Sequence, residues 1–204
     1  MHGSRVKNDT RTLFDRLIRL ADEQGASQAV VIPTASIVVD DSLADLCRSP
    51  DCMVYGQAAS CPPHVGGPSE FRKLLSHFER AIVFKIDVPT PILLSDARLP
   101  VYRRLHGVAA AIEQAAIAGG VPDARAFAGG SCKQIFCCDL PSCPVIAEAS
   151  ACRHPDRARP SMSGYGVDVA RLMAAAGWRM DRITRETSPE AVPMGALVGL
   201  VLIG

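Results

Sequence analysis

Eight cysteines are the residues of this 204-residue chain whose type and spacing could do chemistry. They form two groups separated by seventy residues without any cysteine: Cys47, Cys52 and Cys61, then Cys132, Cys137, Cys138, Cys143 and Cys152. A reducing cytoplasm disfavours structural disulfides, and cysteines that merely pack in a core have no reason to cluster. Thiolates are soft ligands that favour zinc, copper(I) or iron–sulfur clusters. The clustering therefore predicts a metal centre.

The spacing of the cysteines favours an iron–sulfur cluster over zinc. The first group has the pattern C-x4-C-x8-C, and Cys138, Cys143 and Cys152 repeat it. With Cys137 in place of Cys138, the second group becomes C-x4-C-x5-C-x8-C from Cys132. Structural zinc sites usually use cysteine pairs separated by two to four residues, so gaps of five and eight are wide. A cubane cluster is larger than one ion and is often held by an irregular loop.

Helical and strand patterns alternate along the chain and must position these loops. Leucine spacing, capping residues and β-branched runs predict helices over residues 9–26, 70–80, 99–118 and 167–178, and strands over 27–40 (two short ones), 81–88, 123–130, 178–184 and 195–204. This order predicts a single α/β domain over residues 1–204, with a mixed β-sheet flanked by helices. The nearly continuous apolar run at 81–88 predicts a central strand.

Two stretches rich in proline, glycine and cysteine, 47–68 and 129–162, are predicted to be metal-binding loops at strand exits. Prolines directly after Cys61 and Cys143 stiffen these loops and keep the preceding residue out of helical geometry. Four cations near the second cysteine group would offset the negative charge of a cluster, or would simply be solvated: Lys133, Arg153, Arg157 and Arg159. His106, on a helix with two arginines, is expected to be solvated.

Composition argues against nucleic acid or a membrane as the main partner. The formal charge is +1, with 22 basic and 21 acidic residues spread through the chain. No segment approaches the roughly 18 apolar residues of a membrane helix. The first residues lack the apolar stretch of a signal peptide, so a cytoplasmic location is expected.

Three motifs carry a resemblance to a known family: "SCPP", "GGSCKQIFC" and "CRHPDRARPSMSGYGVDVARLMAAAGW". From about Val38 to Gly204 the chain resembles a bacterial and archaeal family of cysteine-rich predicted metal-binding proteins. The resemblance implies ligands at Cys47, Cys52, Cys61, Cys132, Cys137, Cys143 and Cys152. It leaves Cys138 as an extra cysteine, in conflict with the repeated spacing. It implies metal binding without supplying a reaction.

The leading hypothesis is a protein with one or two [4Fe–4S] clusters. The second group, taken with Cys137, supplies a complete four-thiolate set, whereas the first supplies three thiolates. One iron of a three-thiolate cluster would be open to substrate, to solvent, or to a ligand such as His64 or Cys138. Electron transfer or cluster scaffolding, with a redox or enzyme protein as partner, is favoured because no acid–base constellation is visible. Catalysis at the open iron is the alternative.

Two further hypotheses come from other classes. In a zinc-stabilised interaction module, His64 and His154 would complete mixed cysteine–histidine sites. In a cysteine-nucleophile enzyme, Cys137 or Cys138 would be the reactive thiolate, aided by a histidine. The second of these leaves six cysteines unexplained.

Overall fold

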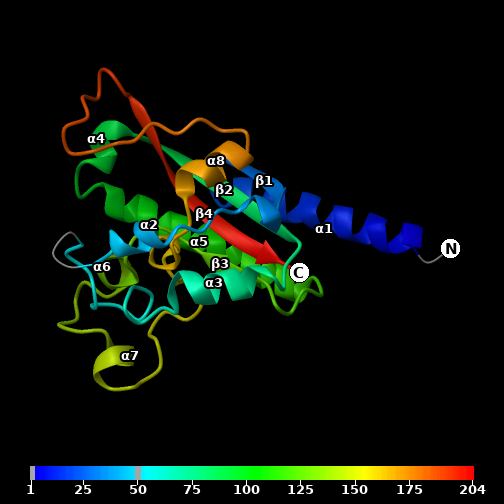
Figure 1. Cartoon of the computed structure of the whole chain (residues 1–204), viewed down its shortest axis with the longest axis horizontal. Coiled ribbons are helices and arrows are strands. Elements are labelled where there is room, and N and C mark those ends of the chain that lie inside the picture. The colour runs from blue at the N-terminus through cyan, green and yellow to red at the C-terminus, as the bar shows by residue number, and fades with distance from the viewer. Residues whose placement is uncertain (1–2, 49–51) are drawn as a thin grey trace.

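A single four-stranded β-sheet organises the computed structural model, which describes residues 3–48 and 52–204. The sheet has the order β1-β2-β4-β3 (Figure 1), with strands β1 (Gln28–Pro33), β2 (Arg80–Pro89), β3 (Arg125–Phe127) and β4 (Met194–Ile203). These strands pair antiparallel throughout, and one isolated parallel bridge joins Ala128 to Ser161. The predicted α/β fold is confirmed, although the strands pair antiparallel and not as the mixed sheet that was expected, and β2 is one of the two inner strands, as its apolar run predicts.

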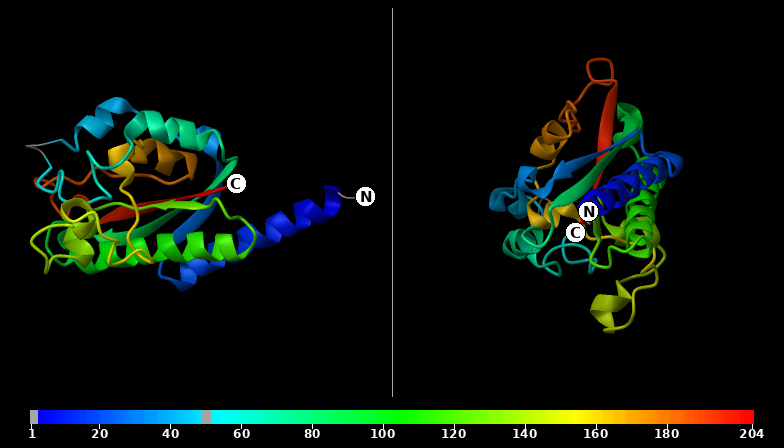
Figure 2. Two further views of the ribbon diagram at one scale, coloured as in Figure 1. Left: turned by 90° about the horizontal axis from the view of Figure 1, so that it is seen from below. Right: turned by 90° about the vertical axis from the view of Figure 1, so that its right-hand side faces the viewer.

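Helices cover both faces of the sheet, as Figure 2 shows. The longer helices are α1 (Gly3–Glu23), α3 (Gly67–Leu75), α5 (Arg98–Ala118) and α8 (Val169–Ala175). On one face, α1 and α5 pack on Ile82 and Phe84 of β2, and on the other face α3 and α8 pack near Val83. Because alternate residues of a strand point to opposite faces, β2 is buried on both sides.

The short helical segments lie mostly near the cysteines. They are α2 (Asp41–Asp45), α4 (Thr90–Leu93), α6 (Cys132–Phe136), α7 (Pro144–Ala147) and the 3₁₀ turns Thr34–Ser36 and Met162–Tyr165. α2 was not expected from the sequence. Its cap is Asp40, whose carboxylate accepts a hydrogen bond from the Ser42 N–H at 2.9 Å.

Two predicted strands are wrong. Residues 178–184 alternate apolar and polar side chains but form no strand: Met180 is exposed, although the Ile183 side chain lies close to Gly195 at the start of β4. The second strand expected within 27–40 is replaced by the turn Thr34–Ser36, whose Thr34 hydroxyl donates to the carbonyl of Phe78. Only an isolated bridge at Val39 follows.

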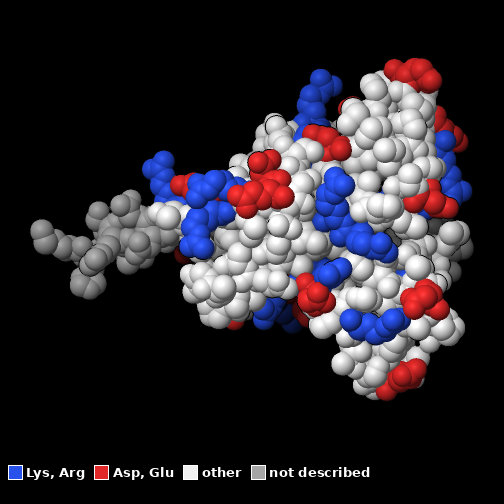
Figure 3. All heavy atoms as spheres, turned by 180° about the vertical axis from the view of Figure 1, so that it is seen from behind, with Lys and Arg blue, Asp and Glu red and all other residues white. Residues whose placement is uncertain are grey.

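The surface carries mixed charge. Acidic and basic side chains are interspersed over the face drawn in Figure 3. None of the described helices is both long and apolar enough to cross a membrane.

Candidate metal centre

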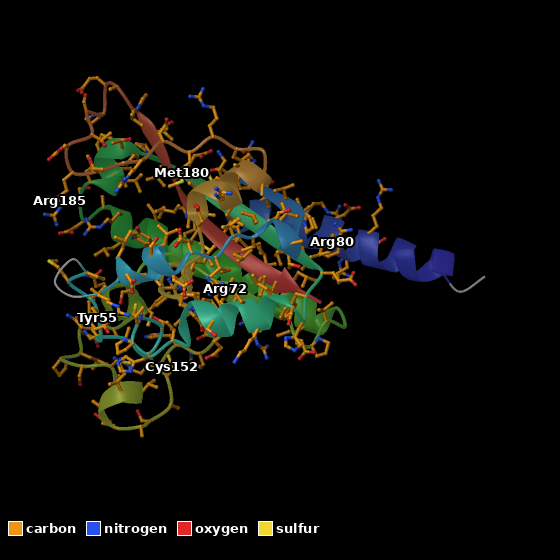
Figure 4. The ribbon with its side chains drawn as sticks, in the orientation of Figure 1. Tyr55, Arg72, Arg80, Cys152, Met180 and Arg185 are labelled. Atoms are coloured by element: carbon orange, nitrogen blue, oxygen red, sulfur yellow. The ribbon has the colours of Figure 1, made fainter. Side chains whose placement is uncertain are left out.

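Both cysteine groups lie at the end of the molecule opposite the N-terminus (Figure 1), and Figure 2 places them at the same end. The first group follows α2, and the second begins with α6 and continues past α7. In Figure 4, Tyr55 from the first loop and Cys152 from the second lie at this end. The backbone N–H of Ser161 donates to the carbonyl of Ser60 at 3.0 Å, which joins the two loops directly.

The backbone closes the second loop at its base. Ala128 donates its N–H to Pro160 at 3.0 Å and accepts from Met162 at 3.3 Å, so the ends of the loop run side by side. The intervening residues 129–160 therefore form a closed segment fixed to the edge of β3. Such closure holds distant cysteines of one loop in a fixed arrangement.

His106 of α5 forms hydrogen bonds with both ends of the second loop from inside the protein. Its Nε2 lies 3.1 Å from the carbonyl oxygen of Gly129, and its Nδ1 accepts the backbone N–H of Arg159 at 3.1 Å. A carbonyl can only accept, so Nε2 carries the proton and the imidazole is neutral. The expectation that His106 is solvated is wrong: it is fully buried, and burial lowers its pKa to about 4. Leu105 and Ala109 of the same helix are buried as well.

Arg159 is a structural cation rather than a group facing the cysteines. Its guanidinium forms an ion pair with Glu113 at 2.7 Å, and both side chains are almost fully buried. It also donates to the carbonyls of Pro155 and Ala158. Glu113 in turn accepts the N–H of Ala126 in β3 at 2.7 Å. The pair ties the second loop to the sheet.

Four cysteines of the second group line one small cavity: Cys132, Cys137, Cys143 and Cys152. The rings of Phe136 and His154 also line this cavity, and their centroids are 5.4 Å apart. The Nε2 atom of His154 is buried and has no hydrogen-bond partner among the described residues. Cys138 is exposed and does not line the cavity. These are the four cysteines that the hypothesis names, with Cys137 rather than Cys138, and metal binding by them stays a prediction.

The three cysteines of the first group line a second, larger cavity of about 210 Å³: Cys47, Cys52 and Cys61. The Arg98 and Tyr102 side chains from α5 and Ser131 from the start of α6 face the same space. His64 does not line it. Its ring is exposed, and its Nε2 lies 3.2 Å from the carbonyl oxygen of Gly56.

Ser60 lies between the two cysteine groups. Its hydroxyl donates to the Cys132 sulfur at 3.0 Å and is 3.9 Å from the Cys61 sulfur. Cys61 and Cys132 are both buried, in a small apolar cluster with Ala58. The two cavities are therefore neighbours. Ser60 was missed from the sequence, although its position directly before Cys61 in "SCPP" was the available signal.

Burial makes these thiols poor nucleophiles. It raises the pKa of Cys47 to about 11, and the adjacent Cys52 and Cys61 add to this effect. It raises the pKa of Cys132 to about 11 as well, although the Ser60 hydroxyl opposes the rise. Burial also raises the pKa of Cys137, and the nearby Arg153 offsets only part of this rise. An activated cysteine needs the opposite shift, so the raised pKa gives no support to Cys137 as a reactive thiolate.

A family comparison agrees with the chemistry of these donors. The sequence profile described as predicted metal-binding protein (DUF2284) matches residues 30–203, a span that contains all eight cysteines. The chain belongs to this family. The resemblance noted from its motifs is confirmed. No curated protein matches the chain, and no solved structure does.

In this DUF2284 protein, the thiols surround spaces rather than converge on a point. Among residues 3–48 and 52–204, no three His, Cys, Asp or Glu side chains lie close enough together to hold one metal ion. The donor set nevertheless fits a thiophilic group. Thiols from distant segments face shared cavities, and mutual repulsion contributes to the raised pKa of Cys47 and Cys132, which a bound cation would relieve.

The cations near the second group have structural partners. The Lys133 ammonium donates to the carbonyls of Cys137 and Leu140 at 2.8 and 2.7 Å. Arg153 pairs with Asp139 at 3.1 Å on the surface. Lys133 and Arg153 line the four-cysteine cavity, whereas Arg157 and Arg159 do not. Only the first two can act on a group bound there.

Proposed function

We propose that this protein carries two [4Fe–4S] clusters in adjoining sites and works in electron transfer with a redox or enzyme protein as its partner. The observation that carries the proposal is the division of seven cysteines between two neighbouring cavities, four in one and three in the other. When bound, such a cluster supplies a one-electron redox couple. Thiolate sites of this kind need reducing surroundings, which favours the cytoplasm.

The spacing of the donors supports a cluster over zinc. Tetrahedral zinc with bonds of about 2.3 Å requires sulfurs about 3.8 Å apart. The described side chains form no such single-ion group, although four thiols share one cavity. A cubane is larger than one ion, so its ligands stand around a volume instead of a point.

The chain's own hydrogen bonds would tune the four-thiolate site. The Ser60 hydroxyl donates to Cys132, and the backbone N–H of His154 donates to the Cys152 sulfur at 3.4 Å. Donors to ligand sulfurs stabilise the more negative, reduced state and raise the reduction potential. The rings of Phe136 and His154 form part of the wall and limit access of water.

Ser60 also gives the two sites a short connection. One hydroxyl lies within 4 Å of a sulfur from each set, Cys61 and Cys132. An electron entering at one cluster would have a covalent and hydrogen-bonded path to the other through these residues. This neighbourhood is the reason to favour electron transfer over two independent structural metals.

Metal analysis of matched variants tests the proposal. Protein purified without oxygen should contain about eight iron atoms and eight sulfides per chain, as two cubanes require. Cys143→Ser should lose about half of both, and after reduction with dithionite its low-temperature electron paramagnetic resonance spectrum should lose one signal. Cys138→Ser is the control, since this exposed cysteine lies outside both cavities, and should retain full content. Stoichiometric zinc without iron, or full iron content in Cys143→Ser, would contradict the proposal.

A further inference from the structure

The cavity of the three-cysteine set reaches beyond its thiols to the start of α5. Arg98, Leu99 and Tyr102 from that helix line it together with Ser131. Arg98 is the one charged side chain among the described residues of the lining, and no Asp or Glu is present there. The four-cysteine cavity differs, because it is small and its two lining cations, Lys133 and Arg153, already have partners in the protein.

We propose that this cavity binds a small monocarboxylate, held by the Arg98 guanidinium, beside the position that three thiolates leave open. This inference rests on the proposed function in one respect, because only a cluster held by three thiolates leaves a coordination position open beside the ligand. The recognition groups belong to the chain itself. It gives the three-cysteine site a ligand, whereas the four-cysteine site serves electron transfer.

The charge of Arg98 is available to a ligand. Its Nη1 donates to the carbonyl of Ser95 at 2.6 Å, and the same atom lies 3.4 Å from Asp96. The Asp96 side chain is 91% exposed, so water screens this pair strongly. A guanidinium offers five donors in a planar fork that matches a carboxylate. Most of that fork has no partner among the described residues.

Hydroxyl groups in the lining supply further polar contacts. Ser131 is 3% exposed, and its Oγ is buried with no hydrogen-bond partner among the described residues. A buried hydroxyl without a hydrogen-bond partner is unfavourable, so Ser131 needs either the neighbouring Cys61 sulfur or a bound molecule as its acceptor. The same hydroxyl opposes the rise that burial causes in the pKa of Cys61, so it lies beside that thiol. A hydroxyl has one proton to donate, and a thiolate and a carboxylate can only accept, so Ser131 can donate to one of these two neighbours at a time.

Size and charge favour a small monoanion over a phosphate or a larger acid. The cavity volume of about 210 Å³ is below that of pockets for drug-sized ligands, about 300–1,000 Å³. One arginine balances one negative charge, and metal-bound thiolates nearby would repel a dianion. The side chains of Val54, Leu99 and Ile135 provide an apolar wall for a short carbon chain.

Calorimetric titration of the anaerobic, metal-loaded protein with propionate tests the inference, with propionamide and inorganic phosphate as comparison ligands. Propionate should bind, and the two others should bind at least about tenfold more weakly, because propionamide loses the charge-assisted bidentate contact and the nearby thiolates repel a phosphate dianion. Arg98→Gln should weaken propionate binding by about tenfold or more, with Arg98→Lys between the two. Arg182→Gln, an exposed arginine outside the cavity, is the control and should bind as the unchanged protein does.

A second readout separates this inference from the proposed function. In protein reduced with dithionite, propionate should change the electron paramagnetic resonance signal of the three-thiolate site and leave the other signal unchanged. Iron and sulfide present at full content, with no propionate binding or with equal binding in Arg98→Gln, would overturn the inference alone. Absence of iron would overturn the proposed function. Titration of the iron-free protein with propionate would still show whether the cavity binds a monocarboxylate, because Arg98 and Ser131 belong to the chain.

Discussion

Protonation of His106 should unfold the base of the second cysteine loop, and its effect can be worked out from the structure. The imidazole is fully buried, and burial, with a further contribution from Arg159, lowers its pKa to about 4 against the opposing effect of the Gly129 carbonyl. In the unfolded chain the value returns to about 6.5. Between these values the unfolded chain binds a proton that the folded protein does not. Stability is therefore complete above about pH 6.5 and falls as the pH falls toward 4.

The magnitude follows from the two values. Linkage with a folded pKa of about 4 and an unfolded pKa of about 6.5 gives a loss of about 2 kcal/mol between pH 7.5 and pH 5. The full separation corresponds to about 3 kcal/mol, reached only near pH 4. The carboxyl groups of three aspartates do not titrate between pH 7.5 and pH 5, since hydrogen bonds lower the pKa of each from its ordinary value near 3.8: Asp40, Asp41 and Asp139.

Urea unfolding, followed through the fluorescence of Trp178, measures this loss. The free energy of unfolding is determined at pH 7.5 and pH 5 for the protein and for His106→Asn, which cannot titrate. The variant is compared only by its pH dependence, because the substitution also removes packing. The unchanged protein should lose about 2 kcal/mol more than the variant over this interval. Equal pH dependence in both proteins would refute a neutral, buried imidazole at the base of the loop.

Two further substitutions test the supports of the site. Glu113→Gln should lower the free energy of unfolding by about 3 kcal/mol, because it leaves the Arg159 charge buried without a counter-ion, and a loss below about 0.5 kcal/mol in urea unfolding would contradict this. Gly130→Ala should cost at least about 1 kcal/mol more than Gly177→Ala, since both have φ near +80° but only the first Cβ meets the Tyr102 ring, at 2.8 Å. Equal thermal denaturation midpoints for the two alanine variants would show that Tyr102 does not pack as described.

The parts of the molecule that depend on local pattern were predictable from the sequence. The apolar runs identify β2 and β4, and the prolines and glycines of residues 47–68 and 129–162 identify both cysteine loops. The alternation of apolar and polar residues at 178–184 predicted a strand wrongly, because a strand also needs a neighbouring strand edge to pair with, and a local pattern does not show one.

The arrangement of the site depends on tertiary contacts and was not predictable in the same way. Ser60 meets Cys132 across 72 positions of sequence. Arg98 and Tyr102 reach the first cysteine group from a helix far from it in the chain, and their neighbours give no signal of this. His106 lies among arginines and alanines on α5, so its burial depends on the loop that covers it rather than on helical periodicity.

Anomalous diffraction at the iron absorption edge, from crystals grown without oxygen, tests the two-cluster arrangement most directly. Two separate groups of iron peaks are predicted, one among Cys132, Cys137, Cys143 and Cys152 and the other beside Cys47, Cys52 and Cys61. Thiols that stand around these cavities with no iron between them, or a lone zinc peak in their place, would contradict it.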